Sequence, residues 1–89
     1  MKTKLLVHGH VQGVGFRYYA QTKAIQRNIK GWAKNMDNGS VEIVAAGENQ
    51  QVEAFIGEME KGSPLAKVEE IEQIEYETEE AFSAFDIKY

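Results

Sequence analysis

Two closely spaced glycines stand between a strand pattern and a helix pattern near the start of the chain, and they constrain the fold more than any other feature. The stretch reads Val11-Gln12-Gly13-Val14-Gly15-Phe16-Arg17. Glycine adopts left-handed backbone angles at little cost, so such a segment can turn its N–H groups toward one anion. The first turn of the following helix adds unpaired N–H donors and the positive end of its dipole. The stretch therefore predicts either an anion site or a plain strand-to-helix turn with a surface arginine.

Arg17 favours the anion interpretation, because its planar guanidinium presents a fork of donors that suits a phosphate or a carboxylate. The known nucleotide motifs do not match this stretch. The P-loop string ending in Gly-Lys-Ser or Gly-Lys-Thr is absent, and the dinucleotide fingerprint would need a glycine where this chain has Tyr18. We therefore expect a site for a phosphoryl-type dianion and no nucleotide site.

Hydrophobic periodicity divides the chain into alternating strand and helix patterns. Strands are expected over residues 4–10, 29–36, 40–46, 67–77 and 85–89, and helices over residues 16–27 and through Val52–Met59, ending at Gly62. This order predicts an α+β, ferredoxin-like α/β sandwich, βαββαβ plus a short terminal strand, with two helices on one face of a mostly antiparallel sheet. We expect residues 1–89 to form a single domain, since no linker, repeat or low-complexity segment interrupts them.

Two parts of this prediction depend on local signals. The apolar residues Val68, Ile71 and Ile74 are spaced by three, which alone favours a helix, but Pro64 precedes them and we interpret the segment as a strand with a bulge. Asn38-Gly39 is a two-residue hairpin signal between the second and third strands. The acidic residues between 69 and 80 are expected to form a solvated strand edge that discourages association of sheet edges.

Charge is distributed unevenly along the chain. Residues 1–36 carry seven basic residues and no acid, whereas residues 37–89 carry fourteen acids and three lysines, for a net charge of −4. The net negative charge argues against a nucleic-acid partner, and the sheet lacks the basic and aromatic surface that RNA recognition needs. The glycine-rich stretch lies in the basic part, where it would attract a small anion.

Compartment and metal content follow from a few residue types. The chain has no cysteine, which favours a reducing compartment, and neither its N-terminus nor any apolar stretch predicts a signal peptide or a membrane span. We expect a cytoplasmic protein without a membrane partner. His8 and His10 share a strand face, but without a third histidine, a cysteine or an obvious carboxylate partner we expect no metal site.

Two long segments resemble the signatures of a known family. Residues Val7–Arg17 (VHGHVQGVGFR) resemble the first signature of the acylphosphatase family, and residues Gly31–Gly47 (GWAKNMDNGSVEIVAAG) resemble the second, with Asn35 in the functional position. Gly62-Ser63-Pro64 and the ending Phe85-Asp86-Ile87-Lys88-Tyr89 are similar to later landmarks of that family. The resemblance covers essentially the whole chain in the right order, and it also implies a strand after Pro64.

The resemblance implies a monomeric enzyme that hydrolyses a small-molecule acyl phosphate to a carboxylate and phosphate, without metal or cofactor. It implies that Arg17 and the N–H groups of Gln12, Gly13, Val14, Gly15 and Phe16 hold the phosphoryl group. Asn35, whose amide both donates and accepts hydrogen bonds, would orient the attacking water. A sequence without a convincing nucleophile, base or metal cluster agrees with this chemistry.

Two residues depart from the pattern of that family. Gly15 stands where many members have a larger side chain, and Met36 stands where some members have a hydroxyl residue that can brace the asparagine. Asn35 would then need another group to hold it. The alternative function is a non-enzymatic ferredoxin-like module that binds an anion or a partner protein, and hydrolysis of benzoyl phosphate or acetyl phosphate would distinguish the two.

Overall fold

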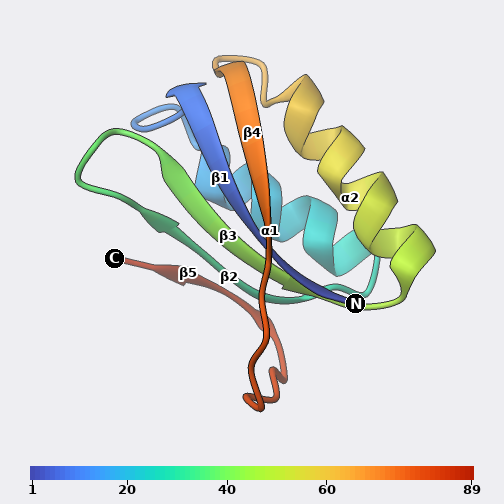
Figure 1. Cartoon of the computed structure of the whole chain (residues 1–89). Coiled ribbons are helices and arrows are strands. Elements are labelled where there is room, and N and C mark those ends of the chain that lie inside the picture. The colour runs from blue at the N-terminus through green and yellow to red at the C-terminus, as the bar shows by residue number, and fades with distance from the viewer.

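A computed structural model of residues 1–89 shows a five-stranded sheet with two helices packed on one face (Figure 1). The strands are β1 (Lys2–His10), β2 (Lys30–Asn35), β3 (Val41–Ala46), β4 (Lys67–Glu75) and β5 (Phe85–Lys88), and the helices are α1 (Phe16–Gln26) and α2 (Asn49–Lys61). The predicted α+β, ferredoxin-like order with a terminal strand is confirmed. Neither helix has the length and apolar character that crossing a bilayer requires.

The sheet order brings three segments from distant parts of the chain to one end of the sheet. The order is β4-β1-β3-β2-β5, and every pair is antiparallel except β2 with β5, which is parallel. Val41 of β3 pairs with Val7 of β1 on one side and with Asn35 of β2 on the other, and Lys34 pairs with Lys88. The loop after β1, the end of β2 and the end of β5 therefore lie together, at the left of Figure 1.

The core lies between the sheet and the helices. The alternation predicted for the strands is confirmed, because Leu5 and Val7 of β1 are fully buried. The other buried apolar residues of the core come from the strands, the helices and the adjoining loops: Val11, Phe16, Ala20, Ala24, Ile29, Ala33, Val41, Ile43, Ala45, Val52, Phe55, Met59 and Phe85. Burial of this apolar surface is the main term that holds α1 and α2 on the sheet.

The bulge predicted for β4 explains the three-residue spacing of Val68 and Ile71. His8 pairs with Glu70 but Gly9 pairs with Val68, so Glu69 is an extra residue on β4. The extra residue reverses the alternation, and Val68 and Ile71 can both pack against the core. Ile74 lies on the opposite side and is 42% exposed. β4 is an edge strand with an acidic surface, as predicted, but it ends at Glu75, so the acidic residues between 77 and 80 lie after the strand and not on its edge.

The β2–β3 hairpin is confirmed, but the predicted two-residue turn is wrong. Met36 donates its N–H to the Ser40 carbonyl at 2.8 Å, and Gly39 donates to the Met36 carbonyl at 3.1 Å. The loop therefore holds three residues, and only Gly39 has a positive φ, of 92°. A type I turn followed by a left-handed glycine fits this pattern, whereas the two-residue turn would require a positive φ at Asn38 as well.

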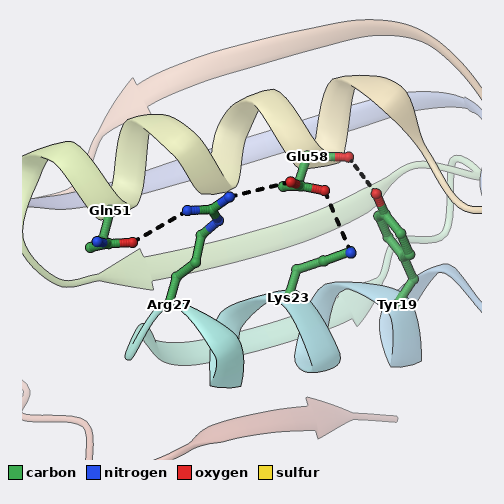
Figure 2. Close-up of polar contacts among 5 residues, drawn as sticks. All are labelled: Tyr19, Lys23, Arg27, Gln51 and Glu58. Atoms are coloured by element: carbon green, nitrogen blue, oxygen red, sulfur yellow. Dashed lines mark hydrogen bonds and ion pairs between the residues drawn. The ribbon is translucent and has the colours of Figure 1, made fainter.

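A polar network between α1 and α2 holds the two helices together (Figure 2). Lys23 of α1 and Arg27, the residue at the C-cap of α1, contact the Glu58 carboxylate of α2 at 3.6 Å and 3.3 Å. The Tyr19 hydroxyl donates to the Glu58 carbonyl at 2.8 Å. Arg27 also donates to Gln51 at 3.4 Å. Since α1 begins at the glycine-rich loop, this network holds the helix that carries Arg17.

The network predicts a loss of stability in acid that depends on Glu58. The hydrogen bond from Arg27 lowers the pKa of Glu58 below its ordinary value of 4.5, and the charge of Lys23 lowers it further against the cost of desolvation. A carboxylate with a lowered folded-state pKa stabilises the fold above its unfolded pKa, and that contribution is lost as the pH falls below about 4.5. We expect Glu58→Gln to lower the melting temperature by a few degrees at neutral pH and by progressively less in acid.

The matched control for this prediction is Glu53→Gln, which makes the same charge change at an exposed position of α2. Thermal unfolding of the three proteins would be followed from neutral pH to about pH 3, across the range where the Glu58 carboxylate takes up its proton. A constant difference between wild type and Glu58→Gln at every pH would contradict the assigned role of the ion pairs.

Candidate active site

The loop between β1 and α1 has the backbone geometry of an anion cradle. Gly13 and Gly15 have φ of 74° and 75°, in the left-handed region that favours glycine. Gly15 is also the N-cap of α1, and no side chain caps that end of the helix. The N–H groups of Gln12 to Gly15 donate no hydrogen bond to the rest of the protein, so they remain available to a ligand.

Gly15 has room around it. A Cβ built at Gly15 would have no atom within 4 Å, so a larger side chain at this position would meet no obstacle except the backbone conformation. Because glycine stands here in place of a larger side chain, the space beside residue 15 remains open. The left-handed φ of the residue is the physical reason that glycine suits this position.

Arg17 lies in the first turn of α1 and is oriented by the end of β5. Its Nη1 donates a hydrogen bond of 2.7 Å to the Lys88 carbonyl, and its guanidinium lies 4.7 Å from the centre of the Tyr89 ring. The carbonyl uses one donor and the ring covers one face, so the remaining donors of the planar fork can serve an anion. The orientation of Arg17 thus depends on β5, although 71 positions separate Arg17 from Lys88 in the sequence.

Asn35 is the last residue of β2, and the structure brings it to the same hollow as Arg17. The hollow has a volume of about 160 Å³. Its lining comprises Val11, Gly13, Gly15, Phe16, Arg17, Tyr18, Asn35, Ile87 and Tyr89. A guanidinium, a carboxamide and a loop with free N–H groups therefore face one small space, which is the donor set that an oxyanion needs.

Two of the predicted loop residues, Gln12 and Val14, are not part of the lining of this hollow. Val14 is partly buried and packs against the hydrophobic core. The side chain of Gln12 donates hydrogen bonds to the carbonyls of Met36 and Ser40, at 2.8 Å and 2.9 Å. For these two residues only the backbone N–H groups, which the sequence analysis proposed, are available to a ligand.

Four residues of the lining were not predicted: Val11, Tyr18, Ile87 and Tyr89. Tyr18 and Tyr89 are 69% and 94% exposed, so both add largely solvent-exposed aromatic side chains to the lining. The alternation at residues 85–89 predicted a strand, but periodicity does not say which neighbour a strand pairs with. The parallel pairing of β5 with β2, in which Ile87 lies opposite Ala33, brings Ile87 and Tyr89 to the hollow that Asn35 also lines.

The two histidines of β1 lie outside this site. His8 is paired through Nε2 with Glu72 of β4 at 2.6 Å, so the expectation that it lacks a carboxylate partner is wrong. The partner was missed because Glu72 is brought beside β1 by the edge strand, more than sixty residues later in the sequence. The pair joins β1 to β4 on the surface of the sheet.

The fold is that of a small α+β protein with a ferredoxin-like sheet, and a hollow at one end of the sheet is lined by a guanidinium, a carboxamide and two loop glycines. The family model named Acylphosphatase matches residues 3–87. An acylphosphatase from Oceanobacillus iheyensis is 45% identical over 87 residues, which cover 97% of this chain and 96% of the relative. The crystal structure of acylphosphatase from Bacillus subtilis superposes with a TM-score of 0.94 at 41% identity, covering 99% of this chain and 98% of the other.

The same fold also occurs as a small part of a longer protein. The crystal structure of full-length HypF in the phosphate- and nucleotide-bound form matches with a TM-score of 0.90 at 32% identity, and the match covers 99% of this chain but 12% of HypF. The present chain matches the short relatives over nearly their full length. It belongs to the acylphosphatase family.

Proposed function

We propose that this protein hydrolyses the carboxyl-phosphate bond of small-molecule acyl phosphates to a carboxylate and inorganic phosphate. The observation that carries the proposal is that Arg17 and Asn35 line one hollow with the glycines of the loop. Membership of the acylphosphatase family supports the same reaction. The domain that does this would be the whole of residues 1–89.

In this proposal the phosphoryl group sits on the loop. The N–H groups of Gln12, Gly13, Val14, Gly15 and Phe16 point at its oxygens, and the positive end of the α1 dipole adds to their effect. The free donors of Arg17 bind the same oxygens and stabilise the charge that they carry in the transition state. Preorganised donors of this kind supply most of what phosphoryl transfer requires from a protein.

Asn35 orients the water that attacks phosphorus. Its carboxamide oxygen accepts a hydrogen bond from one O–H of the water and so directs the oxygen lone pair toward the phosphoryl group. The new P–O bond forms as the bond from phosphorus to the carboxyl oxygen breaks, and the bonding pair leaves with the carboxylate. A phosphoryl oxygen takes the proton of the water. Since a carboxylate is a good leaving group, the site needs no strong general acid.

The test is incubation of the purified protein with benzoyl phosphate, with loss of the acyl phosphate followed over time. Hydrolysis well above the spontaneous rate is expected. If the protein binds phosphate but does not accelerate hydrolysis, it is the anion-binding module described above and not an enzyme.

A second prediction concerns metals. Because the proposed reaction uses only the donors of the loop, Arg17 and Asn35, we expect hydrolysis to survive exhaustive chelation unchanged. Phosphate and sulfate should inhibit competitively, since they would occupy the same donors. Activity that is lost to a chelator and restored by a divalent cation would overturn the metal-independent mechanism.

We also propose that the protein acts as a monomer in the cytoplasm. The acidic residues of the edge strand β4 disfavour pairing between sheet edges of two molecules, and a composition without cysteine suits a reducing compartment.

A further inference from the structure

The side chain of Gln12 joins the glycine-rich loop to the β2–β3 hairpin. Its Nε2 donates to the Met36 carbonyl at 2.8 Å and to the Ser40 carbonyl at 2.9 Å. Both partners are acceptors, so both hydrogens of the amide are used and the amide orientation is fixed. Gln12 directly precedes Gly13 of the loop, and Met36 directly follows Asn35.

The two hydrogen bonds of Gln12 reach the β2–β3 hairpin at Met36 and Ser40, the pair of residues that closes its turn. The Ser40 carbonyl already accepts the Met36 N–H at 2.8 Å, and Gln12 is a second donor to the same oxygen. The contact is partly buried, where a polar group that loses its partner is costly to leave unpaired. Gln12 therefore ties the glycine-rich loop to the backbone beside Asn35 and limits how far the two can separate.

We propose that Gln12 is a positioning residue that holds Asn35 at a fixed place relative to the anion-binding loop. This inference rests on the proposed function. It also supplies what Met36 cannot, because a methionine has no hydroxyl with which to brace Asn35. The side chain of Gln12 holds the backbone next to Asn35, and Gln12 itself belongs to the loop that would hold the phosphoryl group. The loop and the end of β2 are therefore joined, and together they would fix the attacking water relative to phosphorus.

The test variant is Gln12→Met, which keeps the length of the side chain and the backbone N–H but removes both side-chain hydrogen bonds. We expect kcat for benzoyl phosphate to fall about tenfold or more. A displacement of a catalytic group by about 1 Å can lower the rate by on the order of 10²-fold. The inhibition constant of phosphate should change little, because the loop and Arg17 remain. Gln12→Glu removes the same donors and provides a second variant if Gln12→Met does not fold.

A matched control separates positioning from simple support of the hairpin. The Asn38 carboxamide accepts the N–H and the hydroxyl of Ser40, at 3.0 Å and 2.6 Å, so it stabilises the same turn without touching the loop. Asn38→Ala should lower the melting temperature and leave kcat within about twofold of wild type, as expected for sites that do not couple. Equal losses of kcat in Asn38→Ala and Gln12→Met would overturn the inference.

The decisive measurement is the coupling between Gln12 and Asn35. If Gln12 acts through Asn35, then Gln12→Met should reduce kcat in the wild-type protein but hardly at all in the Asn35→Ala background. Additive losses would mean that Gln12 acts independently of Asn35. An inactive wild type would refute the proposed function itself, whereas an active wild type with an equally active Gln12→Met would refute this inference alone.

Discussion

Arg17→Lys is expected to remain folded and to lose roughly 10²-fold or more of its activity toward acyl phosphates, the scale of removing one preorganised donor. The physical reason lies in the way that the guanidinium is held. One N–H is bound to the Lys88 carbonyl and one face lies against Tyr89, while the other donors remain in the hollow. A lysine ammonium is a compact point charge, so it cannot stack, bind the carbonyl and present a planar fork to a phosphoryl group together.

The control for this experiment is Arg27→Lys. Arg27 belongs to the same helix region but contacts Glu58 and Gln51, on the side of α1 that faces α2. The same change of side chain should leave turnover close to that of wild type. Arg17→Ala should lose phosphate binding as well as turnover. Near-normal turnover in Arg17→Lys would show that the arginine is only a surface residue.

Asn35→Ala is expected to lower kcat by about 10²-fold while barely changing the inhibition constant of phosphate. A residue that orients water stabilises the transition state but adds little to the binding of phosphate in the ground state. Its removal therefore lowers kcat and leaves the inhibition constant of phosphate nearly unchanged. Steady-state kinetics with benzoyl phosphate and competition by phosphate would measure both quantities on one sample.

The alternative is that Asn35 only ends a strand before the turn that starts at Asp37, a common use of asparagine. In that case Asn35→Ala would lower the melting temperature and leave kcat nearly intact. Thermal unfolding of the same preparation therefore distinguishes the two roles. Asn38→Ala, which weakens the neighbouring turn, shows how much loss of stability alone affects the rate.

The sequence was sufficient for the elements and for the two polar residues that face the hollow, because these depend on local signals. The strand and helix periods place Leu5, Val7 and the buried face of α2 correctly. Arg17 was found from its place after the glycine-rich loop as well as from the resemblance to a family signature, whereas Asn35 was found through that resemblance alone. Their common position in one hollow is a property of the sheet order.

Other features could not be predicted, because each depends on a contact between distant segments. The side-chain bonds of Gln12 require the hairpin to lie beside the loop, and those of Arg17 require β5 to pair with β2. The three-residue turn was missed for a different reason. Asn-Gly fits the last two residues of that turn as well as a two-residue turn, and the choice is made by the register of β2 on β3.

The parallel pairing of β5 with β2 has a consequence for the order in which activity is gained. Arg17 and the Lys88 carbonyl that orients it are separated by 71 positions, so their contact has one of the largest sequence separations that this chain allows. The loop that this contact closes is among the longest that the chain can form, and the entropy cost of closing a loop rises with its length. A folding intermediate that has assembled β1, β2 and β3 would possess the glycine loop and Asn35, yet it would lack an oriented guanidinium. Catalytic competence therefore requires β5 to dock on β2, the same step that places Phe85 in the core.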